Sequence, residues 1–256
     1  MLTKVGRFEV YMIVAEEMEG STSIIPDADV NILKRFIPET GFILFVNIFL
    51  IKTPNQIILI DTGFGGIIFD RMRELGVEPD QVDAVLLSHL ARDHIGGLQS
   101  DGRALFPNAK VYLDALEYEH FIKIAVSDVA VAALEPYNPV TFNAASLGSP
   151  PNVILPGISA IANYGHTPGH TVFLVEDGGE KLIIAGDFLH IANVQFPYPD
   201  ISATYDIDKM AAAASRRQIM DYAASNNIPI GGTHIEPPAI GRVERDGNGF
   251  RFVPIE

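Results

Sequence analysis

Short apolar runs bounded by turn residues recur along the chain and are typical of buried strands. They predict strands over residues 8–14, 42–51, 56–60, 82–87, 109–113, 158–163, 171–175, 182–185 and 228–231, and a closing hairpin over 242–253. Other segments predict helices over residues 67–75, 115–131 and 208–224. In the second of these, apolar side chains recur three to four positions apart. The third begins near Asp206 or Asp208, and either aspartate suits a helix start.

Two segments show neither the strand pattern nor the helix pattern. Residues 15–40 mix acidic side chains with Ser, Thr and Pro, which favours a loop or lid, and residues 136–156 are rich in Pro, Asn, Ser and Gly, which favours a loop. Strands otherwise alternate with helices, and this order is typical of an α/β fold. No linker or internal repeat interrupts it, so we expect one domain over residues 1–256.

The composition limits the classes of partner. The chain has 256 residues, of which 48% are hydrophobic and 20% charged, so it has enough apolar surface for a core and too little charge for wholesale disorder. Its 18 basic and 32 acidic side chains give a net charge of −14. The adjacent Arg216 and Arg217 lie in an alanine-rich helical stretch, and no basic patch is evident. We therefore expect no nucleic-acid partner and no binding to an anionic membrane surface.

Cysteine is absent, which rules out disulfides and thiolate metal sites. Any bound metal must use His, Asp, Glu or backbone ligands, which favours zinc, manganese, iron or cobalt. The longest apolar stretch, residues 42–51, is broken by Asn47 and is far shorter than the ~20 residues of a membrane-spanning helix. The first nine residues lack an apolar signal core, so we expect a cytoplasmic protein. An exported form whose leader has been removed would have the same sequence.

Histidines and one aspartate gather where predicted strands end. Of the seven histidines, His89, His94, His166 and His234 each lie in a loop just after a predicted strand, as does Asp187. Such loops often carry function, because a rigid scaffold holds them while their tips face solvent. Imidazole and carboxylate are the ligands that a divalent ion such as zinc prefers. Chance is a poor explanation for so many placements, so we interpret the set as a metal site.

Asp93 and His94 are neighbours, and both reach one ion only if they lie on a turn or at a helix start. The glycine pair that follows, Gly96 and Gly97, fits such a bend. His120 differs, because it falls on a predicted helix face. We interpret it as an ordinary packed and hydrogen-bonded histidine.

The order of these residues resembles the metallo-β-lactamase superfamily. The main signature of that family is His-x-His-x-Asp-His, followed downstream by His, Asp and His. The residues that match in order are His89, Asp93, His94, His166, Asp187 and His234, preceded by the step Asp61-Thr62-Gly63. The resemblance covers the chain from about residue 42 to its end.

The C-terminal half is most similar to the branch that contains methyl parathion hydrolase and lactonase-like enzymes. The stretch GHTPGHT over residues 165–171 is common across the superfamily. More specific to the branch are GDFLH over residues 186–190, VQF over 194–196 with Pro199 beyond it, and PAIGRV over 238–243.

The resemblance implies a four-layer αββα sandwich with a metal site at one edge, between the sheets. It assigns ligands to two ions: His89, position 91 and His166 to the first, Asp93, His94 and His234 to the second, and Asp187 to both. We therefore expect one or two divalent ions, zinc foremost, with manganese, iron and cobalt as alternatives.

Position 91 departs from the family pattern, because Ala91 stands where the family has histidine. Alanine offers no donor atom, so the first site keeps only His89, His166 and Asp187. Three interpretations stay open: a working enzyme with a reduced site, a catalytically impaired protein with a binding role, and an engineered substitution. Three protein ligands with an open position are still a catalytic zinc pattern. Arg92, which follows, is expected to point into solvent.

The resemblance implies hydrolysis of a small ester, lactone or organophosphate by a metal-activated water. Asp93 is the candidate catalytic residue, which would orient the water and pass a proton to the leaving group. Asp61 and His170 are expected to orient ligands. His190 and Phe196 are candidates for the substrate pocket, although a packed position is an equal reading for His190.

Other functions are less favoured. The partner is expected to be a small molecule, and a homodimer is compatible with the chain. Cleavage of β-lactams fits the branch markers less well. A di-iron oxidoreductase of the same superfamily needs an added flavin module, and its nucleases carry an added domain and act on polyanions, for which a charge of −14 is unsuited.

Overall fold

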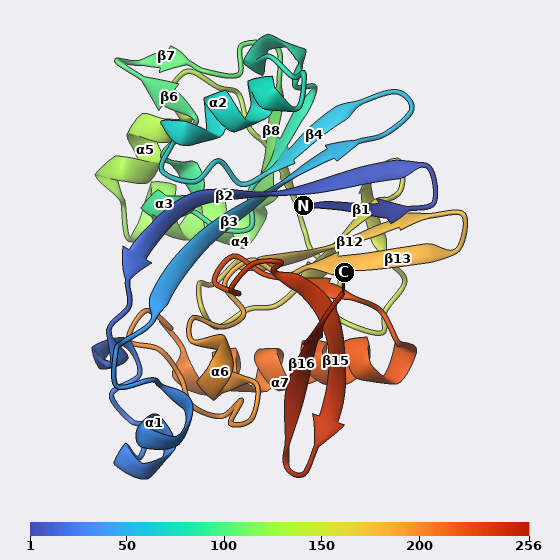
Figure 1. The fold of residues 1–256 in the computed structure, drawn as a ribbon. Helices are drawn as coiled ribbons and strands as arrows, with labels where there is room; N and C mark the ends of the chain where they lie inside the picture. The colour runs from blue at the N-terminus through green and yellow to red at the C-terminus, as the bar shows by residue number, and fades with distance from the viewer. Residues whose placement is uncertain (256) are drawn as a thin grey trace.

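The computed structural model describes residues 1–255, and most of its strands form two seven-stranded sheets (Figure 1). The first sheet has the order β1 (Leu2–Val5), β2 (Phe8–Glu19), β3 (Ile43–Lys52), β4 (Ile57–Ile60), β5 (Ala84–Leu86), β8 (Lys110–Asp114) and β9 (Val140–Phe142). Strands β1 to β4 pair antiparallel, whereas β4, β5, β8 and β9 run parallel to one another.

The second sheet is built from the C-terminal half of the chain. Its order is β10 (Asn152–Leu155), β11 (Ile158–Ala162), β12 (Thr171–Asp177), β13 (Glu180–Ile184), β14 (Ile230–Gly231), β15 (Ile240–Asp246) and β16 (Gly249–Pro254). Only the β13–β14 pair in this sheet is parallel. A separate small hairpin joins β6 (Gln99–Ser100) to β7 (Arg103–Ala104).

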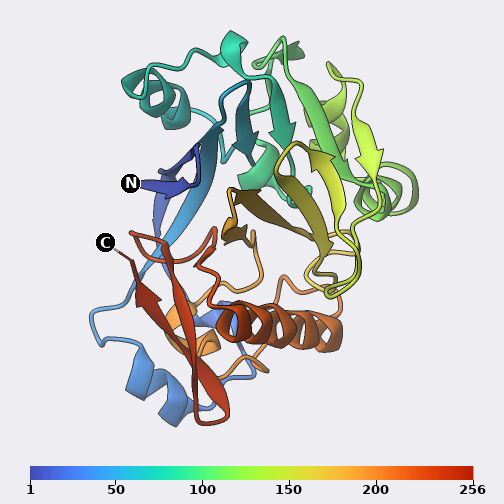
Figure 2. The same cartoon turned by 90° about the vertical axis from the view of Figure 1, so that its right-hand side faces the viewer.

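Helices cover the outer faces of the two sheets (Figures 1 and 2). On the first sheet lie α2 (Ile67–Glu74), α3 (Arg92–Ile95), α4 (Ala115–Tyr118) and α5 (Asp128–Leu134), and α7 (Lys209–Asn226) runs along the second, next to α6 (Ala192–Gln195). Helix α1 (Val30–Phe36) packs against α6. The layers are therefore helices, sheet, sheet and helices, and the predicted four-layer αββα sandwich is confirmed.

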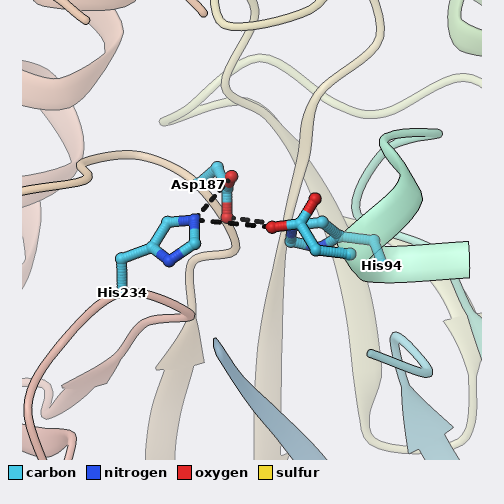
Figure 3. Close-up of side chains that lie close together, drawn as sticks. His94, Asp187 and His234 are labelled. Carbon is cyan, nitrogen blue, oxygen red and sulfur yellow. Dashed lines mark hydrogen bonds and ion pairs between the residues drawn. The ribbon is translucent and has the colours of Figure 1, made fainter. Parts of the chain in front are cut away.

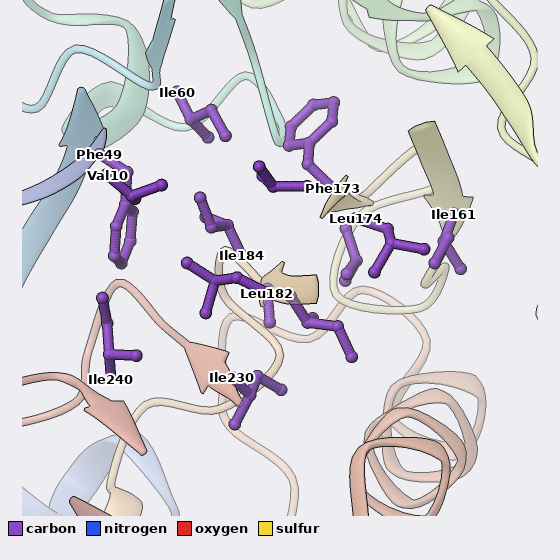
Figure 4. Packing of buried hydrophobic residues seen from close by; sticks show 14 of the residues in the cluster. Val10, Phe49, Ile60, Ile161, Phe173, Leu174, Leu182, Ile184, Ile230 and Ile240 are labelled. Atoms are coloured by element: carbon purple, nitrogen blue, oxygen red, sulfur yellow. The ribbon is translucent and has the colours of Figure 1, made fainter. Parts of the chain in front are cut away.

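The two sheets share one apolar layer, part of which Figure 4 shows. Val10, Phe49 and Ile60 of the first sheet face Phe173 and Ile184 of the second, and none of these side chains is more than 1% exposed. Full burial of one such side chain contributes about 1.5–3 kcal/mol. Because helices cover the other faces, the central strands are buried on both sides, and their sequences are nearly continuous apolar runs.

Three predicted segments were wrong in part. Residues 15–19 are not loop but continue β2, because residues 16–19 pair antiparallel with residues 43–46 of β3. The segment also contains helix α1. The expected loop over residues 136–156 holds β9 and β10. The expected helix over residues 115–131 is broken around residues 125–127, where Ser127 accepts a hydrogen bond from the amide of Ala130 and starts α5.

The closing helix agrees with its prediction. The carboxylate of Asp208 accepts a hydrogen bond from the amide of Ala211, so Asp208 rather than Asp206 is the N-terminal cap of α7. At the other end Asn227 adopts a left-handed backbone with φ of 53°, which ends the helix. Within residues 1–255 no helix combines the length and apolar character that crossing a membrane requires.

Candidate metal centre

The sequence-predicted ligands converge because the strands that precede them are parallel neighbours. Asp187 follows β13 and His234 follows β14, and the carboxyl ends of these two paired strands lie side by side. In the same way Asp61 follows β4, and His89 follows its parallel neighbour β5. The amide of Thr171 donates to the carbonyl of Ser88, which joins the two sheets next to the site.

One cluster consists of Asp93, His94, Asp187 and His234. Figure 3 labels three of them, His94, Asp187 and His234. The Nε2 atom of His94 lies 3.1 Å from Oδ1 of Asp187 and 3.5 Å from Oδ2 of Asp93. The Nε2 atom of His234 lies 3.1 Å from Oδ2 of Asp187 and 3.8 Å from Oδ2 of Asp93. Asp93 and His94 are on α3, so the expectation that a helix start brings both to one point is confirmed. We call this group the second cluster.

The other cluster consists of His89, His166 and Asp187, and we call it the first cluster. The two Nε2 atoms lie 3.2 Å apart, and they lie 3.9 Å and 3.7 Å from Oδ2 of Asp187. Asp187 thus belongs to both clusters. Ala91 stands at the N-terminal cap position of α3 and contributes no donor.

The hydrogen bonds behind the histidines determine which ring nitrogen faces Asp187. His94 donates from Nδ1 to Asp61 over 2.7 Å, His166 to Asp206 over 3.1 Å, and His234 to the carbonyl of Phe45 over 2.6 Å. These partners can only accept, so in a neutral ring Nδ1 carries the proton and Nε2 presents a lone pair.

This arrangement suits a divalent cation. Two donors bound to one tetrahedral zinc at ~2.0–2.1 Å lie roughly 3.4 Å apart. The separations between donor atoms in the two clusters range from 3.1 to 3.9 Å, around this value. Acceptor atoms face one another at this spacing, and Nε2 of His94 and Oδ1 of Asp187 are buried without a hydrogen-bond partner despite their 3.1 Å separation. Such a set of lone pairs is stable only around positive charge, so these residues fit a metal ion.

Asp61 anchors the second cluster from behind. Its carboxylate accepts hydrogen bonds from the amide and the hydroxyl of Ser88, at 2.8 and 2.6 Å, as well as from His94. The backbone of Asp61 has a φ of 59°, which aspartate tolerates better than most residues. The prediction that Asp61 orients a ligand is consistent with this geometry.

The ring of His170 contacts the backbone of Asp187, the aspartate that both clusters share. Its Nδ1 atom donates to the carbonyl of Asn163 over 3.0 Å, and its Nε2 atom accepts the amide hydrogen of Asp187 over 3.0 Å. Gly186 allows this approach, because a Cβ there would lie 2.8 Å from Nε2 of His170. His170 therefore touches a ligand and not the centre of either cluster.

Sequence reasoning missed two residues behind the first cluster. Asp206 accepts from His166 and, through its other oxygen, from the amide of Ala203 and from Arg216 over 3.0 Å. Arg216 is fully buried and also donates to the carbonyls of Phe188, Pro199 and Ile201. An aspartate near a helix start was assigned only a capping role, and nothing in the local sequence marks Arg216 as buried.

Glu117 is a third residue that sequence reasoning missed. Its carboxylate is fully buried and accepts hydrogen bonds from the amide of Leu90, at 2.9 Å, and from the hydroxyl of Thr167 and the amide of Gly169, at 2.7 and 2.9 Å. It thereby joins the loop of His89 to the loop of His166. Burial raises the pKa of Glu117, although these hydrogen bonds oppose that change.

Electrostatics differ between the clusters. Burial lowers the pKa of His94, but the carboxylates of Asp187, Asp93 and Asp61 outweigh burial and raise it well above 6.5. The pKa of His234 is raised in the same way, because Asp187 outweighs burial. In contrast, burial and the neighbouring His94 hold the pKa of His89 well below 6.5. His89 is thus neutral without an ion, whereas His94 and His234 would have to lose protons to bind one.

The candidate pocket residues lie in different places. His190 is buried, with Nε2 only 3.5 Å from Oδ2 of Asp187 and its ring 5.5 Å from that of Tyr205. Phe196 instead packs in the core, with its ring 5.1 Å from Phe252 and 6.0 Å from Phe188. Phe196 also lines a cavity of about 1150 Å³ between α1, α6 and the β15–β16 hairpin. None of the clustered histidines lines this cavity.

Two remaining expectations concern residues outside the clusters. His120 lies in the irregular helix η3 (Glu119–Ile124), against the ring of Phe121, and belongs to neither cluster. Arg92 is exposed at the start of α3, as expected.

Known proteins share this fold and parts of this sequence. One curated relative, the hydroxyacylglutathione hydrolase of Aeromonas salmonicida (strain A449), is 37% identical over 65 residues, which are 25% of this chain. The match covers 24% of the relative, about a quarter of its length.

Two solved structures match the whole chain. The hydrolase AbOPH, described as a member of the beta lactamase superfamily, is 28% identical with a TM-score of 0.89, and AidC, described as a dizinc quorum-quenching lactonase in complex with a product, is 24% identical with a TM-score of 0.87. Each match covers 100% of this chain and 97% of the other. The model of the metallo-beta-lactamase superfamily matches residues 41–227, most of the chain. The chain therefore belongs to the metallo-beta-lactamase superfamily.

Proposed function

We propose that this protein is a metal-dependent hydrolase of a small ester, lactone or organophosphate, with a first metal site weakened by Ala91. The observation that carries the proposal is the sharing of Asp187 by two donor clusters whose lone pairs converge. Zinc is the preferred ion, because the donors are imidazoles and carboxylates at tetrahedral spacing. We also place the chain in the branch of methyl parathion hydrolase and lactonase-like enzymes.

When bound, a divalent ion at these donors supplies Lewis acidity and lowers the pKa of a water toward neutrality. The protein supplies the positioning. Asp187 ties the two clusters together, while Asp61 and Asp206 hold His94 and His166 with Nε2 facing inward. Asp93 is suited to move a proton, because its side chain is 22% exposed whereas that of Asp187 is 4% exposed.

The surroundings of the clusters favour a substrate with an apolar part. Tyr205 and Ile207 are more than half exposed, at 56% and 55%, and the amide of Ile207 donates to the carbonyl of His166. Met210, three residues further on, is 85% exposed. Apolar side chains beside a polar centre suit an acyl or alkyl chain attached to the scissile group. The product-bound lactonase with the same fold supports a lactone as the first substrate to test.

A binding role without catalysis is the second candidate, and Ala91 is the observation that favours it. The deciding experiment measures metal per chain by elemental analysis on the protein and on Ala91→His, each with a screen of chromogenic esters, lactones and phosphotriesters. We expect bound metal and hydrolysis that a chelator abolishes. A protein that binds no ion and is inert, while Ala91→His gains both, would establish the binding role.

A further inference from the structure

Asn47 is the only polar residue in the apolar stretch of residues 42–51. It lies on β3, its side chain is 1% exposed, and its neighbours Val46 and Ile48 are fully buried. Burial of an amide is unfavourable unless hydrogen bonds replace those that it loses with water. A polar side chain at this position therefore needs partners, and those that it has lie on a single loop.

That loop carries His234. The Nδ2 group of Asn47 donates to the carbonyls of Gly232, Thr233 and Ile235, at 3.3, 2.9 and 2.7 Å. The backbone amide of Asn47 also donates to the carbonyl of Thr233, over 2.9 Å. Because carbonyls can only accept, they determine that the amide nitrogen, and not Oδ1, faces the loop. Asn47 thus holds the backbone on both sides of His234.

Strand β3 can bond to this loop because its other neighbour ends early. Strand β4 pairs with residues 49–52 of β3 and goes no further. Residues 45–47 therefore keep backbone groups for the loop after β14, and the carbonyl of Phe45 accepts from Nδ1 of His234 over 2.6 Å. A strand of the first sheet thus holds a loop of the second sheet, with His234 at the centre of the contact.

His234 differs from two other clustered histidines in the partner of its Nδ1 atom. His94 and His166 each donate to a carboxylate side chain, whereas His234 donates to the backbone carbonyl of Phe45. A side chain can follow a ring that moves, but a carbonyl in the middle of a sheet cannot. His234 therefore keeps this bond only while its loop stays at one distance from β3, and Asn47 is the side chain that spans that distance.

The other polar atom of Asn47 has no partner. Its Oδ1 atom is buried without a hydrogen bond, which is unfavourable. A leucine has about the same size and would avoid this cost among the buried apolar side chains of β3. An unsatisfied atom in such a place needs an explanation, and the contact with the loop of His234 offers one.

We propose that Asn47 is a positioning residue of the second cluster. It holds the loop of His234 against β3, so that Nε2 of His234 stays 3.1 Å from Oδ2 of Asp187. The inference rests on the metal-dependent function proposed above. Asn47 donates to no clustered side chain, so it acts only through the backbone of the loop.

The test loads metal-free protein with Zn²⁺ or Co²⁺ alone and measures ions per chain, affinity by chelator competition, and the visible spectrum of the Co²⁺ form. Asn47→Leu keeps the size of the side chain and removes its donors, and Asn47→Asp turns a carboxylate toward the same carbonyls. Asn55→Leu is the control, because Asn55 is exposed in the turn that follows β3. His234→Ala identifies the ion of the second cluster, and thermal unfolding establishes that each variant folds.

We expect Asn47→Leu to weaken the ion of the second cluster by about 10–100-fold, as for other residues behind a ligand, and to change the Co²⁺ spectrum. The ion of the first cluster should keep its affinity, and Asn55→Leu should change neither. Asn47→Asp should have the larger effect, because oxygen lone pairs would then face one another.

A merely structural role predicts a different result. Asn47→Leu would then lower the unfolding temperature and leave both affinities unchanged, or weaken both ions equally, and either outcome would overturn the proposal. Bound ions that His234→Ala does not affect would overturn it as well. A parent protein that binds no ion at all would overturn the proposed function, and this inference with it.

Discussion

The two donor clusters meet at Asp187 but are prepared for an ion in different ways. In the second cluster, His94 and His234 face the carboxylates of Asp93 and Asp187, which raise the pKa of both histidines. In the first cluster the only carboxylate is Asp187, and the pKa of His89 is lowered by burial and by His94. The second cluster thus has two carboxylates, whereas the first has one carboxylate and a His89 ring that burial keeps neutral.

The residues that hold the two clusters in place also differ. The second cluster is held by Asp61 and Ser88, which lie just beyond β4 and β5 and bond directly to one another and to His94. The first is held by Glu117, which joins its two loops, and by the ion pair of Arg216 with Asp206 behind His166. A site with fewer charges depends more on preformed geometry, so we expect the first cluster to be the more sensitive to changes in its surroundings.

Loss of the shared carboxylate should have the largest effect. Asp187→Asn keeps the shape of the side chain but removes the charge that both clusters use, so both ions should be lost and hydrolysis should fall on the order of a thousandfold. Elemental analysis and steady-state kinetics measure this, with the exposed Asp200→Asn as a matched control. Retention of one full ion would show that the clusters are independent.

Asp93→Asn should distinguish the two clusters, because it changes a residue of the second cluster only. The first cluster does not contain Asp93, so its ion should remain, while hydrolysis falls by roughly a hundredfold because proton transfer is lost. Unfolding should occur at an unchanged temperature, as the side chain is partly exposed. Full turnover in this variant would remove Asp93 from the proposed mechanism.

The supports can be compared with a pair of isosteric changes. In Asp61→Asn, an amide that donates to His94 forces the proton of that ring onto Nε2, where it blocks an ion. In Asp206→Asn, the oxygen stays with Ala203 and Arg216, so the amide group faces His166 with the same result. Each change should weaken only its own ion, by about 10–100-fold. Equal loss of both ions in either variant would contradict the division into clusters.

The pH dependence of metal binding should be the smallest of the expected effects. Raised pKa values keep His94 and His234 protonated at higher pH than usual, and an ion needs their lone pairs, so binding at the second cluster releases protons. Its affinity should therefore fall as pH falls, by about tenfold per pH unit for each proton released. The lowered pKa of His89 predicts a weaker dependence for the first cluster. Calorimetry in buffers of different ionisation enthalpy counts the protons.

The sequence by itself determined the chain's fold class and the identity of the clustered residues. Short apolar runs predicted most strands, and the placement of His89, His94, His166, His234 and Asp187 just after predicted strands predicted a metal site. Both features can be recognised from a few neighbouring residues at a time. The local sequence pattern did not predict the strand at residues 15–19. This part of β2 is extended because it pairs with β3, not because its apolar residues are periodic.

Only the tertiary structure decided what surrounds the clustered residues. Glu117 lies 27 residues from Leu90 and 50 from Thr167, and Asp206 lies 40 residues from His166, so no spacing rule connects them. Phe196 follows a buried histidine loop in sequence, yet its ring packs in the core beside Phe252. Side-chain partners across such separations depend on how sheets and loops pack, because hydrogen bonds and burial are properties of three-dimensional neighbours rather than of chain order.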